Sequence, residues 1–453
     1  MKPKPFSALN HLTVPRATAP PCHSPTNVAD ATGADRAGCG SVSSPRTVDE
    51  HRAVVAALLG PAAATEDVPV GEALGRVLAA DIAAAVSLPS FDNSAMDGYA
   101  VRASELAGAT PDAPVVLPVA TDIPAGRTDV PVLEPGTVHR IMTGAPLPPG
   151  ADAVLPVEQT DGGVTRVSLH GAPEVGAFVR RAGEDVTAGD VVLEAGAVVG
   201  PAQVGVIAAV GAATVAVRRR PVVLVLSTGS ELVEPGRPLR TGQIYESNGP
   251  MLAAAVTEAG GRAELLRFVP DDVEQFLDRL RERLAGRAPE DRVDLVLTSG
   301  GVSAGAYEVV KDAFTGRGVE FVKVAMQPGG PQGAGRVGEL GGVAVVTLPG
   351  NPVSSHVSFE VFVRPALRAV LGHPSPERPM RTAVLGESWT SPKGRRQFRR
   401  GVLDADGTTV REVGTSGSHM LGALARAECL VVVPADVTDL RKGTPVEVWS
   451  LDR

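Results

Sequence analysis

Three short segments rich in Gly, Ser and Thr are the parts of this sequence best suited to bind an anion. They read STGSELVEPG (227–236), TSGGVSAGAYEVVK (298–311) and LPGNPVSS (348–355), and each follows a continuous apolar run. Glycine lets the backbone approach an anion, and exposed amides can then point at phosphate oxygens. The segments therefore predict a phosphate-binding site, although tight turns alone would also explain them.

Acidic residues accompany these segments. Glu231 and Glu308 lie within two of them, Glu246 lies in GQIYESNG (242–249), and Asp271 and Asp272 follow a further apolar run. Carboxylates repel a phosphate unless a divalent cation bridges the two, and Mg²⁺ binds few carboxylates together with phosphate oxygens. One of the two aspartates is expected to cap a helix instead.

The elements that must position these residues alternate between strand and helix. Continuous apolar runs such as PVVLVLST (221–228) and VAVVTLPG (343–350) are typical of strands buried on both faces. Helical patterns lie between or after them, one of them beginning at Asn248 as its N-cap. This alternation predicts βαβ units and a mostly parallel sheet over residues 218–372, with ligands at the carboxyl ends of its strands.

The flanking regions have other patterns. Thr47 and Glu50 form a capping box before a helix that reaches Leu59, and a second helix is expected over residues 71–82. Short β-branched runs separated by Gly and Pro predict an all-β region from Val86 to about Val217, with a small-residue helix near residues 200–211. A similar pattern over 373–453 predicts a small β-barrel or sandwich.

Composition excludes several classes of protein. The 453 residues carry 43 Lys and Arg against 51 Asp and Glu, so a net charge of −8 gives no global attraction for nucleic acid or an anionic membrane. No uninterrupted apolar run is long enough to span a bilayer. Three cysteines cannot build a disulfide framework, and the N-terminus lacks a secretory signal, so a cytoplasmic location is expected. Residues 1–46 are expected to be a disordered tail.

Two of the segments together resemble a known domain. TSGGVS (298–303) followed by LPGNPVS (348–354) is similar to the molybdopterin-binding α/β domain of molybdenum cofactor biosynthesis proteins. Three further motifs, SFDNSAMDGYAV (90–101), HRIMTGAPLPPGADAVLPVE (139–158) and VRRAGEDV (179–186), resemble the molybdopterin molybdenumtransferase family. That family includes the bacterial molybdate insertase and the matching domain of gephyrin, and the resemblance covers about residues 47–453.

The resemblance implies a multidomain α+β and α/β fold. Its parts would be an elongated linking domain (47–89 with 182–217), a β-rich lid domain (90–181), the α/β domain (218–372) and a C-terminal β-barrel (373–453). It also implies insertion of molybdate into adenylylated molybdopterin with release of AMP, dependent on Mg²⁺. Members are homodimers in which the partner's lid domain contributes to the cleft, and a transient contact with the adenylyltransferase is expected.

The family motifs also imply site residues. Asp97 and Thr143 would come from the lid, and Lys323 with barrel groups would hold molybdate. The acidic side of the cleft would contain Glu231, Glu246, Asp271 and Glu308, with Glu308 the chief metal ligand and Glu246 the second. Donors to the terminal phosphate would be Ser299, Gly300, Gly301 and Ser303. The last loop would be shaped by Pro349, Gly350, Asn351 and Pro352.

Other residues keep two interpretations. Arg180 and Asp185 match a family segment but could form a structural ion pair. The barrel groups near molybdate would come from Arg395, Arg396, Arg399, Arg400, Ser416 and Ser418, and one of the four arginines is expected to be functional. His356 and His419 are interpreted as a helix-surface residue and a barrel-loop residue without a role.

The sequence departs from the family at the expected oxyanion site. Gln327 and Gly330 stand where many relatives have lysines, Glu308 replaces an aspartate, and Ala306 replaces an acid. These changes leave open the affinity for the oxyanion and the choice between molybdate and tungstate. Two alternatives are an adenylyltransferase, against which the lid motifs argue, and a non-catalytic scaffold like gephyrin, which loss of the lysines would permit.

Overall fold

The structure is a computed structural model that describes residues 44–60, 64–266, 272–301 and 309–451. The predictions for Asp271, Ser303, Ala306 and Glu308 fall outside these residues. The chain divides into two units, residues 1–44 and residues 45–453.

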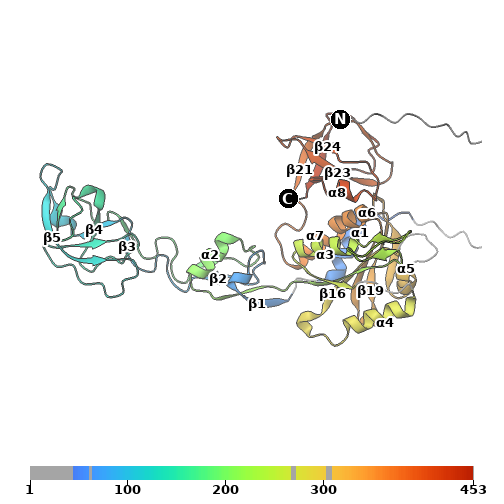
Figure 1. The fold of residues 1–453 in the computed structure, drawn as a ribbon, viewed down its shortest axis with the longest axis horizontal. Coiled ribbons are helices and arrows are strands. Elements are labelled where there is room, and N and C mark those ends of the chain that lie inside the picture. Colours follow the sequence, from blue (N-terminus) through green and yellow to red (C-terminus); the bar gives the residue numbers. More distant parts are fainter. Residues whose placement is uncertain (1–43, 61–63, 267–271, 302–308, 452–453) are drawn as a thin grey trace, which may run out of the picture. The chain divides into compact units, whose positions relative to one another are not determined.

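A six-stranded sheet forms the α/β domain (Figure 1). Its order is β15 (Arg262–Leu266), β12 (Val222–Ser227), β16 (Val293–Ser299), β20 (Val343–Leu348), β19 (Pro331–Val337) and β17 (Val319–Lys323). Strands β15, β12, β16 and β20 are parallel. Strand β19 runs in the opposite direction, and the edge strand β17 pairs antiparallel with β19, so β17 has the direction of the first four. The prediction of a mostly parallel sheet is confirmed.

Helices cover both faces of this sheet because alternate side chains of its strands point to opposite sides. Val223 and Val225 of β12 belong to one buried cluster, while Leu224 and Leu226 belong to another. The first cluster contains residues of α1 (Val48–Leu59), α3 (Asn248–Glu258), α6 (Pro352–Ser358), a π-helical segment (Phe359–Val363) and α7 (Arg364–Val370). The second contains residues of α4 (Val273–Leu284) and α5 (Val309–Phe314).

Two of the predicted helix starts are confirmed. Thr47 and Glu50 form the capping box of α1, and the side chain of Asp272 accepts a hydrogen bond from the Gln275 amide as the N-cap of α4. Helix α1 packs on α7 and on the sheet of the α/β domain rather than on the strands that follow it. The division of the chain into a linking domain and its neighbours stays a prediction.

The region between α1 and β12 is built mainly from short strands. One pair is β1 (Thr65–Pro69) with β11 (Thr214–Arg218), and another is β2 (Ile82–Ala83) with β10 (Val191–Leu193). Helix α2 (Pro201–Ala209) confirms the small-residue helix. The prediction of a helix over residues 71–82 was wrong. Only a 3₁₀ turn (Val70–Glu72) forms there, and Gly75 has a φ of 74°. Val77 and Leu78 make β-bridges instead.

The expected lid region contains a five-stranded sheet. Its order is β7 (Ala153–Pro156), β4 (Gly98–Val101), β6 (Val138–Ile141), β5 (Val115–Ile123) and β8 (Arg166–Leu169). Beside it, β3 (Asn93–Ser94) pairs with β9 (Val179–Arg180), and 3₁₀ turns lie at Ala103–Leu106 and Val157–Gln159. The β-rich character expected from the sequence is confirmed.

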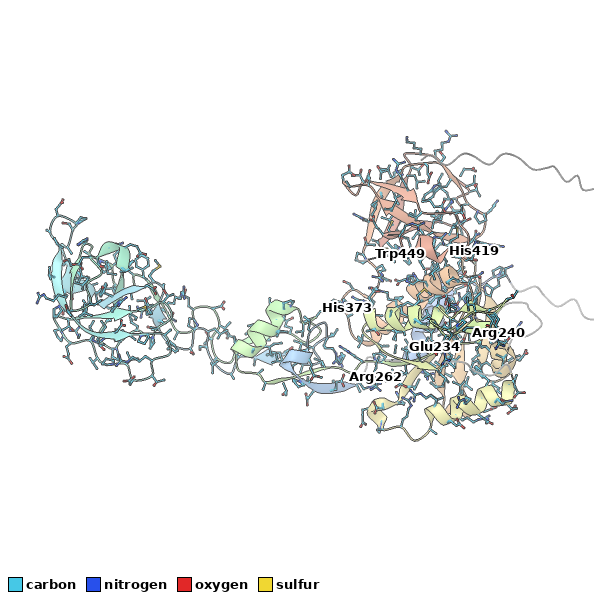
Figure 2. The ribbon with its side chains drawn as sticks, in the orientation of Figure 1. Glu234, Arg240, Arg262, His373, His419 and Trp449 are labelled. Carbon is cyan, nitrogen blue, oxygen red and sulfur yellow. The ribbon has the colours of Figure 1, made fainter. Side chains whose placement is uncertain are left out.

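The C-terminal region is a closed barrel. Its strands are β23 (Arg396–Leu403), β24 (Thr409–Glu412), β21 (Met380–Leu385), β27 (Pro445–Ser450) and β25 (Cys429–Val433), and β25 pairs again with β23. Helix α8 (Leu421–Leu424) and the pair β22 (Trp389–Thr390) with β26 (Asp439–Leu440) complete it. Strand β18 (Met326–Gln327) pairs with β23. Figure 2 labels Trp449 of β27 and His419 before α8.

The remaining short elements are β13 (Leu232–Val233), β14 (Ile244–Tyr245) and 3₁₀ turns at Pro289–Asp291 and Gly338–Leu340. Among the described residues, no helix has both the length and the apolar character needed to cross a bilayer.

Candidate functional site

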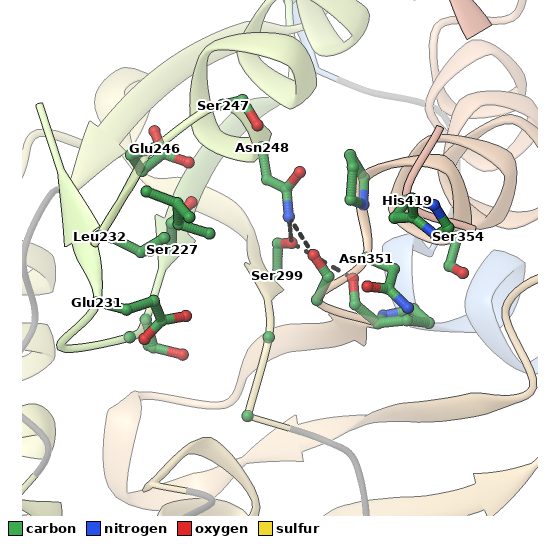
Figure 3. A pocket seen from close by; sticks show the side chains of 18 of the residues that line it. Ser227, Glu231, Leu232, Glu246, Ser247, Asn248, Ser299, Asn351, Ser354 and His419 are labelled. Carbon is green, nitrogen blue, oxygen red and sulfur yellow. Dashed lines mark hydrogen bonds between the residues drawn. The ribbon is translucent and has the colours of Figure 1, made fainter. Parts of the chain in front are cut away.

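The three Gly- and Ser-rich segments begin at the carboxyl ends of neighbouring parallel strands of the α/β sheet. Ser227 at the end of β12 pairs with Ser299 of β16, and Ser299 pairs with Leu348 of β20. The loops that follow these strands therefore start side by side, as the sequence predicts. They line a cavity of about 700 Å³ (Figure 3), which we call the main cavity.

Predicted residues form much of this cavity. Those that line it are Glu231, Glu246, Ser299, Gly300, Gly301, Pro349, Gly350, Asn351 and Pro352. A further wall is apolar and comes from Leu232, Ile244 and Tyr245 of β13 and β14, of which Ile244 and Tyr245 are exposed. The cavity thus offers a polar floor and an apolar side, a combination suited to a flat heteroaromatic ligand that carries phosphate.

Asn248 holds two of the loops together. Its Nδ2 donates to Ser299 Oγ at 2.8 Å and to the Gly350 carbonyl oxygen at 2.6 Å (Figure 3). The prediction that Asn248 caps α3 was wrong, because the N-cap is Ser247, which makes no side-chain capping bond. The amide is used instead to join the ends of β16 and β20 to the start of α3.

The loop after β16 needs glycine. Gly300 and Gly301 have φ values of 95° and 68°, in the left-handed region that side chains with a Cβ avoid. A Cβ on Gly301 would also lie 2.9 Å from Val310 Cβ. These positions keep the backbone of the loop without side chains where it lines the cavity, although the Gly300 amide itself donates to the Leu348 carbonyl oxygen at 3.1 Å.

A small oxygen-lined cradle adjoins this loop. Glu246 is buried and its Oε1 accepts a hydrogen bond from the Gly249 amide at 2.7 Å. A Cβ on Gly249 would lie 2.8 Å from Glu246 Oε2 and 3.1 Å from Ser227 Oγ. Ser227 Oγ is buried and has no hydrogen-bond partner within the described part of the chain. Carboxylate and hydroxyl oxygens with spare capacity are the donors that Mg²⁺ prefers.

The described residues contain no cluster of three or more His, Cys, Asp or Glu side chains suited to a metal. Glu231 lines the main cavity together with Glu246, and Glu308, the expected chief ligand, is outside the described residues. A magnesium site that uses one or two protein carboxylates and phosphate oxygens fits this donor set.

A second cavity of about 570 Å³, which we call the basic cavity, adjoins the first. Lys323 and Arg395 line it, together with Gln327, Ser416 and Ser418. Lys323 is exposed at the end of β17. Gly329, Pro331, Ser354 and His419 line both cavities. Positive charge and hydroxyl groups at this place suit a tetrahedral oxyanion.

The four arginines of GRRQFRRG have separate environments. Arg396 makes a bidentate pair with Asp49 at 2.9 and 2.8 Å, and Arg399 pairs with Glu412 and lies over the Trp389 ring at 4.5 Å. Arg400 is buried and donates to the carbonyl oxygens of Thr415 and Gly417. Only Arg395 of the four lines either cavity, which identifies it as the candidate for the oxyanion site.

The lid residues Asp97 and Thr143 lie against each other. Asp97 Oδ1 accepts hydrogen bonds from the amide and the hydroxyl of Thr143, both at 2.7 Å. These bonds hold the pKa of the exposed Asp97 carboxyl below its ordinary value. Neither residue lines the main or the basic cavity.

The ion pair considered for Arg180 and Asp185 is not formed within the described chain. Arg180 pairs in β9 with Asn93, while the neighbouring Arg181 bridges to Asp92 at 2.6 Å. The amide of Asp185 donates to the Leu88 carbonyl oxygen. The conformation of this segment is therefore fixed by its backbone and by Arg181.

Sequence reasoning gave no site role to six polar residues that line the main cavity: Ser227, Thr228, Ser247, Asn248, Ser354 and His419. Ser227 and Ser354 lie inside the segments singled out from the sequence, so their position at the strand ends was a usable signal. His419 lies in the same loop as Ser416 and Ser418, which the family resemblance places near molybdate, so these neighbours were a usable signal, but His419 itself was interpreted as having no role.

Comparison with known proteins agrees with this arrangement. Residues 46–211 match the family model described as the MoeA N-terminal region (domain I and II), and 224–369 match the probable molybdopterin binding domain. Residues 382–451 match the MoeA C-terminal region (domain IV). Molybdopterin molybdenumtransferase 2 of Mycobacterium tuberculosis (strain H37Rv) is 55% identical over 413 residues, 90% of this chain and 100% of that protein. The chain belongs to the molybdopterin molybdenumtransferase family.

Other members of the family are more distant. The molybdopterin molybdenumtransferase of Haemophilus influenzae is 36% identical over 411 residues, 89% of this chain and 98% of that protein. The crystal structure of the molybdopterin biosynthesis moeA protein from Pyrococcus horikoshii is similar with a TM-score of 0.72 and 32% identity. It covers 90% of this chain and 100% of that one.

Proposed function

We propose that this protein inserts molybdate into adenylylated molybdopterin and releases AMP. The observation that carries the proposal is the junction of the main cavity with the basic cavity through Ser354 and His419. The main cavity is large enough for a pterin joined to a nucleotide, since ligand sites are commonly 300–1,000 Å³. The basic cavity offers Lys323 and Arg395 to an oxyanion.

The residues of the main cavity would bind and orient the phosphates. The Gly301 amide would supply a donor at the strand ends. The Gly300 amide and the Ser299 hydroxyl already donate to the carbonyl oxygens of Leu348 and Pro349, so they fix the loop instead, and Asn248 joins it to Gly350. Orientation of this kind reduces the entropic part of the barrier because the reacting groups are already placed. Lys323 and Arg395 would hold molybdate beside the dithiolene.

Magnesium is part of the proposal, with Glu246 and Ser227 as holders beside Glu231, and Glu308 as the expected chief ligand. When bound, Mg²⁺ neutralises phosphate charge and polarises the bond to the departing phosphate. The buried oxygens of Glu246 and Ser227 support this assignment.

A homodimer is also proposed, with Asp97 and Thr143 of one copy completing the site of another. The mutual hydrogen bonds that fix this exposed pair support it. If the lid residues act in the partner's site, mixing equal amounts of Asp97→Ala and Lys323→Ala protein should restore about a quarter of wild-type activity after subunit exchange. About half of the dimers are then mixed, and each mixed dimer has one intact site out of two. The cytoplasmic location and a contact with the adenylyltransferase remain further parts of the proposal.

The test supplies purified protein with adenylylated molybdopterin, molybdate and Mg²⁺, and measures AMP and active cofactor. Loss of one charged donor to an oxyanion costs about 1.5–3 kcal/mol, so Lys323→Ala should raise the molybdate requirement roughly 10- to 100-fold. Lys442→Ala, an exposed lysine outside both cavities, is the matched control. Full activity in both Lys323→Ala and Glu308→Ala would remove these residues from the reaction.

Two further measurements distinguish this function from the two alternatives, an adenylyltransferase and a non-catalytic scaffold. Consumption of ATP with unmodified molybdopterin would indicate an adenylyltransferase, although the family matches over 46–211 and 382–451 do not favour it. Absence of binding to both nucleotide and cofactor in a calorimetric titration would indicate a scaffold.

A further inference from the structure

His419 occupies the boundary between the two cavities. Four residues line both, and of these only Ser354 and His419 carry a polar side chain. Figure 3 labels His419 and Ser354 among the residues that line the main cavity. The His419 ring is exposed, and it makes no hydrogen bond to another described residue, so both ring nitrogens are available to a ligand.

The loop that carries His419 is held firmly from both sides. Below it, the buried Arg400 donates to the Thr415 and Gly417 carbonyl oxygens. Across the domain junction, Asn351 Nδ2 donates to Ser418 Oγ at 2.8 Å, and the Val353 amide donates to the Ser418 carbonyl oxygen at 3.1 Å. The backbone position of the imidazole is thereby fixed relative to the loop after β20.

The charges around His419 differ on its two sides. Lys323 and Arg395 face the basic cavity, and Glu231 and Glu246 face the main cavity, while Arg400 lies beneath the loop. Cations that bind an oxyanion cannot exchange protons with it near neutral pH, because Lys and Arg stay protonated there. Histidine is the side chain that ordinarily exchanges protons in this range.

The reaction needs such a group. In the proposed function, a dithiol and a molybdate anion form two Mo–S bonds while one Mo–O bond breaks. The two thiol protons leave with that oxygen as water, so no electron is gained or lost. At least one proton must therefore pass from a sulfur at the end of the main cavity to an oxygen held in the basic cavity.

We propose that His419 carries this proton, accepting it from a thiol and donating it to the departing oxygen. The inference rests on the proposed function and adds a residue that acts on the reacting atoms. Its position, its free ring nitrogens and the contrast with the neighbouring fixed cations are the observations that support it.

The experiment compares wild type with His419→Gln in single-turnover insertion of molybdate over a range of pH. General acid–base catalysis contributes about 10²–10⁴-fold, so the variant should lose at least about 10² in rate and most of its pH dependence. Glutamine preserves hydrogen bonding, so molybdate affinity measured by titration should change less than about threefold. His170→Gln, whose side chain lines neither cavity, is the control.

A second variant tests proton transfer independently of folding. His419→Gly should recover rate when imidazole is added, in proportion to its concentration, whereas Lys323→Ala should not respond. A His419→Gln protein with the wild-type rate and pH profile would overturn the proposal, as would a loss of affinity as large as the loss of rate. Wild-type protein that forms no cofactor would instead overturn the proposed function.

Discussion

Asn248 offers the sharpest test of how the main cavity is built. Its amide makes two hydrogen bonds, to Ser299 Oγ and to the Gly350 carbonyl oxygen, and each links α3 to a different strand end. Replacement by alanine removes both. A hydrogen bond between neutral groups contributes about 1 kcal/mol, so Asn248→Ala should lower the free energy of unfolding by about 2 kcal/mol. With a urea dependence of about 2 kcal/mol per M, the midpoint should fall by about 1 M.

The assay is urea unfolding followed by two signals. Both tryptophans, Trp389 and Trp449, lie in the C-terminal barrel, so fluorescence reports the barrel while far-UV circular dichroism reports the whole chain. The dichroism midpoint should move more than the fluorescence midpoint. Thr257→Ala is the matched control, since it removes one exposed hydrogen bond from the same helix and should shift the midpoint by less than about 0.3 M.

The direction of the two bonds can be tested separately. Asn248→Asp keeps the size of the side chain but replaces the donating amide with a carboxylate, which repels the Gly350 oxygen. This variant should be at least as unstable as Asn248→Ala. Wild-type stability in Asn248→Asp, or an Asn248→Ala midpoint within about 0.2 M of wild type, would refute the assignment of Asn248 as the link between the loops.

Two predictions concern pH. Because Thr143 holds the pKa of Asp97 below its ordinary value, Thr143→Val should raise that pKa in an NMR titration of the carboxyl carbon, and an unchanged titration would contradict this. The variant should be less stable than wild type at neutral pH, but equally stable below the pH at which wild-type Asp97 takes up its proton. Burial lowers the pKa of His51 from 6.5 to about 4, so the unfolded chain binds the proton first and stability should fall as the pH drops from 6.5 to about 4. The loss should approach about 3 kcal/mol and be absent in His51→Leu, measured by urea unfolding at several pH values; equal slopes in the two proteins would show that other groups are responsible.

The α/β domain was the most predictable part of the chain. Its strands are continuous apolar runs with cores on both faces, and Thr47 and Asp272 cap helices by local rules. The wrong secondary-structure predictions fall where tertiary contacts determine the conformation of the backbone. The Ala- and Leu-containing segment near Leu78 pairs with distant strands instead of coiling into a helix.

The site could be predicted as far as local sequence determines it. The strand ends brought Ser299, Gly300 and Gly350 together because parallel strands share an edge. The amide of Asn248 was misassigned, since a cap and a cross-link have the same sequence signature. Arg395 could not be singled out from the sequence, because the other three arginines are engaged by residues distant from them in the sequence or by the barrel loop. A local sequence pattern does not predict such contacts.

The backbone of Arg46 has a consequence for how this protein can be handled. Its amide donates to the Lys323 carbonyl oxygen at 2.9 Å, its own carbonyl accepts from the Ala325 amide at 2.8 Å, and its side chain pairs with Glu320. The segment before α1 is thus hydrogen-bonded to the chain that follows β17, where Lys323 lines the basic cavity. A shortened protein that begins after Arg46 would lose these two backbone hydrogen bonds and the ion pair with Glu320. An expression boundary or an affinity tag should therefore be placed upstream of Arg46.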